Sequence, residues 1–349
     1  MKPAFAQAIL HWYTQNRREL PWRDIDDPYR IWVSEIILQQ TRVVQGFDYY
    51  QRFIKAFPSV EALAAASEDE VLHVWQGLGY YSRARNMREA ARQIIQNGGD
   101  FPQEYKDVRA LKGVGDYTAA AICSFAYGAH HAVVDGNVYR VLSRYFGIEE
   151  PIDTTKGKKV FAALAQDLVP EGHSADYNQG LMDFGAIQCV PQSPACLLCP
   201  LADSCHAHLT GKVEDFPIKI HRTKITERYF VYVCVETPEG LWIHKRATSG
   251  IWKGLYEFPL LEFNSPANLD EIRHHAFFGC LSGRETWKLE QKDLRHVLTH
   301  RIIHADVYSL TCASAIPLPD GFIAVSPKEL TQYPMPKLVQ NVANKLKWL

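Results

Sequence analysis

Four cysteines lie close together in the segment CVPQSPACLLCPLADSC, at Cys189, Cys196, Cys199 and Cys205. Four thiolates within so short a segment can converge on one metal centre. Zinc bound by four sulfur atoms usually takes two close cysteine pairs, whereas here a single C-x2-C pair has wider gaps on both sides. Such gaps suit a loop around a larger group, such as one 4Fe-4S cluster. The spacing favours this cluster, and zinc is the alternative.

Two carboxylates stand in contexts that suit acid-base chemistry. Glu35 lies in IWVSEIILQQT, whose apolar residues predict burial and a raised pKa, as a general acid requires. Asp135 lies in AVVDGNVYRVLSR, directly before a helix with apolar periodicity. Plain structural roles explain both residues as well, because Glu35 could be an exposed helix residue and aspartate is a favoured N-cap.

The segment LKGVGDYTAA contains a tight G-x-G turn, formed by Gly113 and Gly115, between an amphipathic helix and a run of helix formers. We expect a helix-hairpin-helix near residues 109–127. The backbone N–H groups at the start of its second helix would bind phosphate, and Lys112 would add positive charge. A lone G-x-G is a weak signal, and a simple turn between two helices is the alternative.

The secondary structure expected around these residues changes once along the chain, from helices to a mixture of strands and helices. Up to residue 206 the apolar periodicity is helical, and Ser67 and Glu70 form a predicted capping box. Residues 207–225 are polar, contain proline and are predicted as a linker. In the rest of the chain, RYFVYVCVETPEGLWIHKR predicts a β-hairpin, more short strands follow, and a helix ends the chain. We therefore expect a multidomain protein, with an all-α domain at 1–206 and an α+β domain at 226–349.

Length and composition set wider limits. The 349 residues suffice for about two domains, and no apolar run reaches the roughly 20 residues that a bilayer requires. We expect an intracellular protein without a membrane partner. The net charge of −1 means that any affinity for nucleic acid comes from a local surface. The remaining cysteines are isolated and expected in the core: Cys123, Cys234, Cys280 and Cys312.

Several stretches together resemble the MutY-type adenine DNA glycosylases of the helix-hairpin-helix superfamily. They are SEIILQQT, GLGYYSRARN, LKGVGDYTA, VVDGNVYRVLSR, NQGLMDFGAIQC and the C-x6-C-x2-C-x5-C loop. The resemblance covers the helical domain almost from end to end and implies a 4Fe-4S cluster in the loop 189–205. It also implies removal of adenine mispaired with 8-oxoguanine or guanine in double-stranded DNA, by flipping the adenine into a pocket between two helical subdomains.

The resemblance implies roles for residues of the reacting centre. Glu35 matches the acid that protonates adenine at N7, and Asp135 matches the carboxylate that stabilises the oxocarbenium ion of the sugar. Tyr117 and Asn137 match residues that line this sugar. Asp183 stands where family members have Asp or Glu near the catalytic water.

Other matched residues would contact the DNA. Gln40 and Tyr80 match residues inserted beside the lesion pair, although Tyr80 without the resemblance would be assigned to the core. Lys112 stands where the family usually has proline. The second domain resembles the family's Nudix-like domain, which recognises 8-oxoguanine, but it has no Nudix catalytic signature. There LTH replaces FSH, so Thr299 keeps the hydroxyl beside His300, while the preceding leucine cannot stack as an aromatic ring would.

Two other functions stay open at this point. An endonuclease III-type pyrimidine glycosylase and lyase shares the hairpin, the aspartate and the cluster, but has lysine at the position of Tyr117 and ordinarily lacks the second domain. A non-enzymatic cluster-containing DNA binder or redox sensor would not require both Glu35 and Asp135. We expect a monofunctional, monomeric enzyme, located in the cytoplasm with the nucleoid if the source is bacterial.

Overall fold

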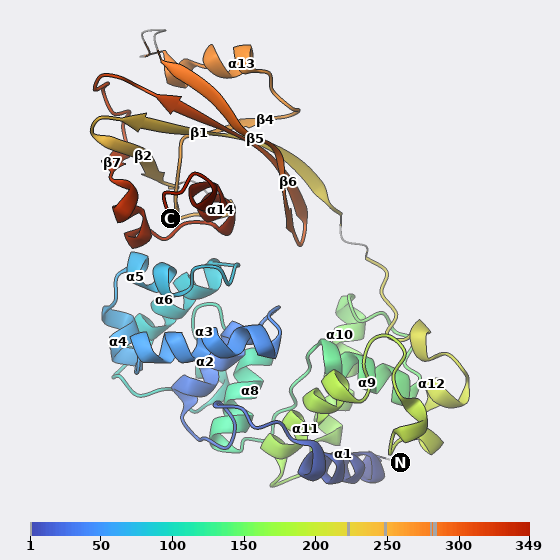
Figure 1. Cartoon of the computed structure of the whole chain (residues 1–349). Helices are drawn as coiled ribbons and strands as arrows, with labels where there is room; N and C mark the ends of the chain where they lie inside the picture. Colours follow the sequence, from blue (N-terminus) through green and yellow to red (C-terminus); the bar gives the residue numbers. More distant parts are fainter. Residues whose placement is uncertain (1, 222–223, 248–249, 280, 282–284) are drawn as a thin grey trace. The chain divides into compact units, whose positions relative to one another are not determined.

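The computed structural model describes residues 2–221, 224–247, 250–279, 281 and 285–349 (Figure 1). It divides into two compact units, one formed by Met1–Ala64 and Glu89–Arg222, the other by Ala65–Arg88 and Thr223–Leu349. No helix in the described part is long and apolar enough to cross a membrane. The expected order, a helical part followed by an α+β part, is confirmed.

The first unit is built almost entirely from helices. The α-helices before the strands are α1 (Lys2–Asn16), α2 (Pro28–Leu38), α3 (Val43–Ala56), α4 (Val60–Ala65), α5 (Glu68–Val74), α6 (Ser82–Gln96), α7 (Tyr105–Ala110), α8 (Asp116–Tyr127), α9 (Gly136–Phe146), α10 (Thr155–Leu168), α11 (Ser174–Ile187) and α12 (His206–Leu209). Of these, α5 lies in the second unit and α6 begins there. The capping box at the start of α5 is present as predicted.

The core of the first unit brings together α1, α9, α10 and α11. Phe5 and Ile9 of α1 pack with Phe161 of α10 and Phe184 of α11, and all four are fully or almost fully buried. Two glycines let α11 approach its neighbours closely. A Cβ atom at Gly180 would lie 2.9 Å from Tyr13 Cβ, and one at Gly185 would lie 2.6 Å from Asn137 Cβ. Helix α11, which lies between them, therefore sets the distance between α1 and α9.

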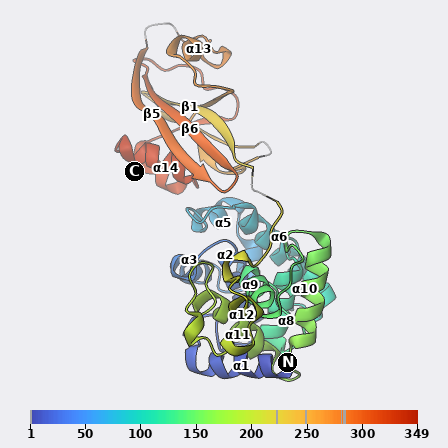
Figure 2. The same cartoon turned by 90° about the vertical axis from the view of Figure 1, so that its right-hand side faces the viewer.

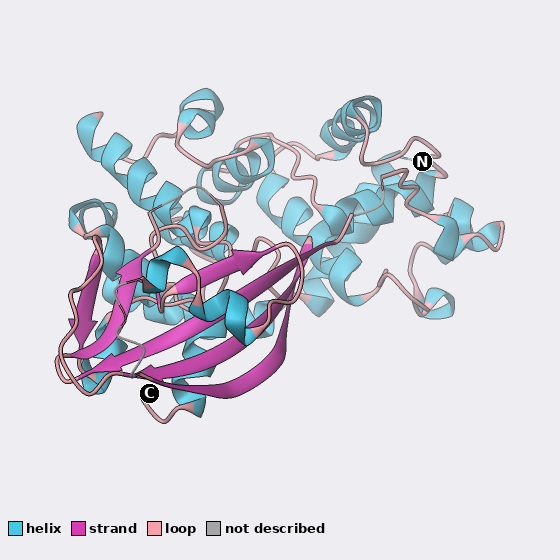
Figure 3. Ribbon diagram, turned by 90° about the horizontal axis from the view of Figure 1, so that it is seen from above, coloured by secondary structure: helices cyan, strands magenta, loops and turns pink. Residues whose placement is uncertain are grey.

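The second unit contains a mixed β-sheet with helices on both faces. Its elements are β1 (Thr226–Thr237), β2 (Gly240–Lys245), β3 (Tyr256–Glu257), β4 (Leu260–Phe263), α13 (Leu269–Arg273), β5 (Thr286–Leu298), β6 (Arg301–Thr311), β7 (Phe322–Val325) and α14 (Lys337–Lys345). The strand order is β3-β2-β1-β6-β5, with β4 paired to β1 and β7 paired to β2. In Figure 3 the strands, in magenta, form one curved sheet.

The strand β1 is buried on both faces. Phe230 and Tyr232 face a core that includes Leu338 of α14, while Val231 faces a second core that includes Ile272 of α13. The two helices accordingly lie on opposite faces of the sheet (Figure 2). The predicted β1–β2 hairpin is present, and β1 also pairs in parallel with β6.

The structure differs from the sequence analysis in two details. The strands β5 and β6 were expected to be short, but they have 13 and 11 residues and pair over almost their whole length. Their length follows from two supporting cores, since β6 contributes side chains to both. The start of the predicted linker is partly helical, at α12 and Val213–Asp215. The predicted domain boundaries remain predictions.

The isolated cysteines follow the expectation where they are described. Cys123, Cys234 and Cys312 are buried. Cys280 lies outside the described residues.

Candidate active site

Glu35 is buried in α2, with 6% of its surface exposed. The helix begins at Pro28, a residue suited to a first helical position, and Asp27 caps it by accepting from two backbone N–H groups. The Tyr117 hydroxyl of α8 donates a hydrogen bond of 2.6 Å to Glu35 Oε2. Burial raises the pKa of Glu35, while the Tyr117 hydrogen bond and the Arg23 charge oppose this rise. A protonated Glu35 can therefore hold its proton on the other oxygen, Oε1.

Asp135 is the N-cap of α9, and its carboxylate accepts from Val138 N and from Asn137 Nδ2, both at 2.8 Å. The N-cap role that the sequence allowed for Asp135 is thus present in the structure. Burial raises the pKa of Asp135, while these two donors oppose the rise. The helix N-terminus also favours the ionised form. Asp135 is close enough for its charge to raise the pKa of Glu35.

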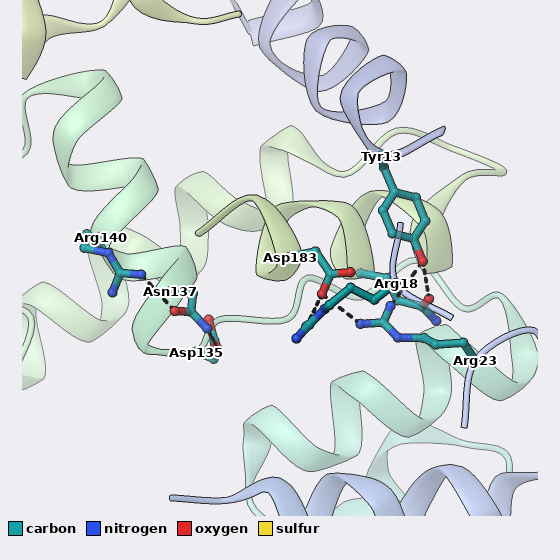
Figure 4. A network of polar contacts seen from close by, with 8 residues as sticks. Tyr13, Arg18, Arg23, Asp135, Asn137, Arg140 and Asp183 are labelled. Carbon is teal, nitrogen blue, oxygen red and sulfur yellow. Dashed lines mark hydrogen bonds and ion pairs between the residues drawn. The ribbon is translucent and has the colours of Figure 1, made fainter. Parts of the chain in front are cut away.

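A chain of hydrogen bonds continues along α9 from Asn137 to the cysteine loop. Arg140 Nη2 donates to Asn137 Oδ1 at 2.9 Å and to Gly185 O at 2.6 Å, and Arg140 Nε donates to Cys189 O at 2.8 Å. Figure 4 shows Arg140 directed at Asn137, beside Asp135. Asp135, Asn137 and the cysteine loop are therefore linked through residues of α9.

The four cysteines of the loop line a single pocket. Arg144 Nη1 donates to Cys189 Sγ at 3.4 Å and to Val190 O at 2.8 Å. Burial raises the pKa of Cys199 to about 11, so this thiol requires a strong positive charge to become a thiolate. Bound iron supplies such a charge. Within the described residues, no group of three or more His, Cys, Asp or Glu is arranged to hold a metal ion. The fit to an iron–sulfur group rests on the shared pocket and the Arg144 donor.

Asp183 forms an ion-paired cluster that the sequence analysis only partly anticipated. It is fully buried and pairs through Oδ1 with Arg18 and, at 3.1 Å, with Arg23. Among the residues that the structure describes, its Oδ2 has no hydrogen-bond partner. Figure 4 shows both arginines converging on this carboxylate, with Tyr13 beside Arg23. The two arginines lie in the segment RRELPWRD. The positively charged residues on both sides of the apolar LPW were the sequence feature that could have indicated a functional role.

The expected hairpin is present in the first unit. It consists of α7, a turn through Lys112 and Gly113, and α8 with Gly115 as its N-cap. Gly113 has φ 78°, a conformation that favours glycine. The Lys112 side chain is exposed, and its backbone N–H donates to Gln93 Oε1 at 2.8 Å. The turn presents the positive end of α8 to solvent, as phosphate binding requires.

In the second unit, Tyr80, Thr299 and His300 line one cavity of about 560 Å³. The hydroxyls of Tyr80 and Thr299 are hydrogen-bonded to each other. Thr299 and His300 form the turn between β5 and β6. Trp252 and Leu298 contribute apolar side chains to the lining of the same cavity. Tyr80 is 43% exposed and has φ 48°, so it is not a core residue.

The structure thus brings the site residues into separate groups. Glu35 and Tyr117 are hydrogen-bonded to each other, Asp135 is hydrogen-bonded to Asn137, and the three predicted DNA-contact residues of the second unit share a cavity. Gln40 lies just beyond the end of α2, is exposed, and has φ 58°. Such a backbone conformation is uncommon for a residue other than glycine and often marks a functional position.

Three family models match the chain. Residues 33–170 match the HhH-GPD superfamily of base excision DNA repair proteins. Residues 189–205 match the iron-sulfur binding domain of endonuclease III, and residues 230–345 match the NUDIX domain.

Whole-chain comparisons point the same way. The adenine DNA glycosylase of Buchnera aphidicola subsp. Baizongia pistaciae is 34% identical, and the match covers 87% of this chain and 84% of that relative. The adenine DNA glycosylase of Mus musculus is 33% identical, and the match covers 89% of this chain and 71% of that relative.

Two solved structures resemble the helical part. A thermostable thymine-DNA glycosylase has 34% identity and a TM-score of 0.56, covering 60% of this chain and 97% of that one. A non-covalent endonuclease III–DNA complex has 21% identity and a TM-score of 0.52, with coverages of 60% and 98%, and shows the fold alone.

Proposed function

Because this chain belongs to the adenine DNA glycosylases, iron–sulfur enzymes of base excision repair that bind DNA, we propose that it removes adenine mispaired with 8-oxoguanine or guanine. The observation that supports this function best is the buried, Tyr117-bonded Glu35 within electrostatic range of Asp135. Adenine leaves poorly as an anion, so removal requires a proton donor on the base and negative charge beside the sugar.

Each carboxyl group has one role in this mechanism. The adenine is flipped out of the duplex, and Glu35 transfers its proton to N7, breaking its O–H bond as the new N–H bond forms. The bond between C1′ and N9 then breaks, and its electron pair goes to the protonated base. Asp135 stabilises the oxocarbenium ion, water adds to C1′, and the proton that this water releases passes to the Glu35 carboxylate, which restores the acid. Asn137 orients Asp135 through the hydrogen bond between them.

The enzyme is monofunctional in this proposal, because Tyr117 occupies the position where the lyase branch has lysine. An amine can form a Schiff base with C1′ and start β-elimination, but a phenol cannot. Tyr117 instead orients Glu35. The product is an intact strand with an abasic site.

The iron–sulfur group is one 4Fe-4S cluster, held by Cys189, Cys196, Cys199 and Cys205. Four thiolates bind such a cluster, and the four cysteines line a single pocket. The bound cluster would cross-link the loop and supply the positive charge that the thiolates require. Anaerobically purified protein should be brown, with about four irons per chain. A colourless preparation with stoichiometric zinc would contradict the assignment.

The preference for 8-oxoguanine rests on the cavity of the second unit, where Tyr80, Thr299 and His300 present polar groups. The helix-hairpin-helix turn binds the DNA backbone through its amides and Lys112, and Gln40 inserts beside the lesion pair. We further propose that the enzyme acts as a monomer and, in a bacterium, in the cytoplasm with the nucleoid.

A single-turnover assay tests this function. Duplexes with A opposite 8-oxoguanine, A opposite G, T opposite G, and an oxidised pyrimidine are incubated with the protein, with and without alkali. Excision of adenine alone, with strand breaks only after alkali, is the expected result. The T opposite G duplex is included because of the likeness to a thymine-DNA glycosylase. Excision of thymine or of oxidised pyrimidine at a higher rate than adenine would refute the proposal.

A further inference from the structure

The cluster around Arg23 contains two residues to which the proposed chemistry gives no task. The Tyr13 hydroxyl of α1 donates to Gln179 Oε1 of α11 at 2.8 Å. The same hydroxyl accepts from Arg23 Nη1 at 3.2 Å. The other terminal nitrogen of Arg23, Nη2, lies 3.1 Å from Asp183 Oδ1. Partners from two helices therefore fix both terminal nitrogens of one guanidinium group (Figure 4).

The packing leaves Tyr13 little freedom. Its side chain is buried, and a Cβ atom at Gly180 would lie 2.9 Å from Tyr13 Cβ and 3.1 Å from its Cγ. The two helices are thus in contact at this residue, directly beside Gln179. The Arg23 side chain is itself only 9% exposed. Its position is set by the protein and not by solvent.

The charge of Arg23 acts on the proposed acid. The titratable groups that influence Glu35 are Tyr117 from α8, Asp135 from α9 and Arg23 from the segment between α1 and α2. Arg23 is the cation among them, and Asp183 partly balances it through the ion pair. When Glu35 gives up its proton, a buried carboxylate is left, and a nearby fixed cation stabilises it.

We infer that Tyr13 and Gln179 are positioning residues, which hold Arg23 in place so that its charge stabilises the Glu35 carboxylate formed by proton transfer. This inference rests on the proposed role of Glu35 as the acid. Without the Tyr13 hydroxyl, Arg23 would keep one anchor at Asp183 and lose the other. Its charge would then be spread over several side-chain positions at a greater average distance from Glu35.

The test is the pH dependence of single-turnover excision of adenine opposite G by Tyr13→Phe. Two changes are expected together. The rate at the acidic plateau falls by about fivefold, which corresponds to a loss of about 1 kcal/mol in stabilisation of the Glu35 carboxylate in the transition state. The alkaline limb, where Glu35 loses its proton, moves to higher pH, because a displaced Arg23 lowers the pKa of Glu35 less. Gln179→Leu should reproduce both changes.

Tyr29→Phe is the matched control. Tyr29 is also a buried tyrosine, its hydroxyl donates to Phe57 O at 2.7 Å, and it lies on the same helix as Glu35. The control should leave the alkaline limb in place. If both Tyr13→Phe and Gln179→Leu lower the rate equally at every pH, or leave it unchanged, the two residues only pack α1 against α11 and the inference is wrong.

Glu35→Gln separates this inference from the proposed function. If the wild type removes no adenine, the proposed function is wrong, whereas if Glu35→Gln still removes adenine, Glu35 is not the acid and the positioning inference falls with it. If Glu35→Gln is inactive while the alkaline limb of the pH–rate profile of Tyr13→Phe matches that of the wild type, only the positioning role is wrong.

Discussion

At the scale of single residues, the burial of Glu35 has two effects that oppose each other. Its burial raises its pKa, which keeps the acid protonated for catalysis but penalises the charged form in the folded protein. The folded pKa lies above the unfolded one, so stability from this group is present below the unfolded pKa and is lost as pH rises through the folded pKa. Catalysis and stability thus place different demands on the same carboxyl group.

The first prediction concerns this conflict. Glu35→Gln should abolish adenine removal, because an amide cannot act as the general acid, while duplex binding remains measurable. The variant should also lose less stability than the wild type between mildly acidic and mildly alkaline pH, since it lacks the buried Glu35 carboxyl that ionises in the wild type. Urea unfolding at both pH values measures this. An identical pH dependence of unfolding in the two proteins would contradict the buried-acid account.

The second prediction concerns Tyr117, at the first turn of α8. Tyr117→Lys should gain strand nicking without alkali and a covalent complex that borohydride traps, because it places an amine where the lyase branch has its nucleophile. Burial lowers the pKa of a lysine and so favours the neutral, reactive amine. Tyr117→Phe, which removes only the hydroxyl, is the control and should gain neither. Efficient nicking by the wild type would refute the monofunctional assignment.

At the scale of elements, α11 determines the geometry of the reacting centre. It contributes Gln179 to a hydrogen bond with Tyr13 and Asp183 to an ion pair with Arg23. Its glycines, Gly180 and Gly185, allow close contact with Tyr13 and Asn137. Gln179 and Asp183 are four residues apart and therefore share a helix face, so one orientation of α11 makes both of their contacts.

The third prediction tests this contact. Gly185→Ala places a methyl group 2.6 Å from Asn137 Cβ and 3.0 Å from Asn137 O, so α9 and α11 must separate. We expect a loss of about 1–3 kcal/mol in stability and, at a temperature where the variant is folded, a larger loss in excision rate than in duplex affinity. Thermal unfolding, binding and single-turnover rates distinguish the effects. Equal losses in rate and affinity would mean that Asn137 is not displaced.

Sequence patterns predicted the elements better than the contacts between them. Periodicity and capping residues located the helices, since these signals are local, and the resemblance identified Glu35, Asp135 and Tyr117. The structure showed what no local signal contains, namely that Tyr13, Arg23 and Gln179 meet. Gln179 is far from the other two in the sequence, and all three residue types are compatible with ordinary surface positions.

At the scale of the whole molecule, the second unit recruits residues 65–88 from within the helical part of the sequence. Lys245 pairs with Asp69 at 2.5 Å, and Arg85 Nη1 donates to Lys253 O at 2.6 Å. Gly254 has φ 80°, and a Cβ atom there would lie 2.8 Å from Glu68 Oε1. The segment that contains Tyr80 is therefore supported by the Nudix-like domain.

The fourth prediction follows from this support. A chain that ends at residue 225 should still remove adenine opposite G but lose most of its preference for adenine opposite 8-oxoguanine, because Tyr80 loses its partner Thr299 and the cavity disappears. Within the full chain, Thr299→Ala should reduce the preference by about 1–3 kcal/mol if the hydroxyl contacts the oxidised base. The ratio of the two single-turnover rates measures both effects.

Thr331→Ala, on the same domain with its hydroxyl bonded to Lys328 O, is the matched control and should retain the wild-type ratio. If the truncated chain and Thr299→Ala both keep that ratio, the cavity does not recognise the lesion, and the preference arises from the helical domain.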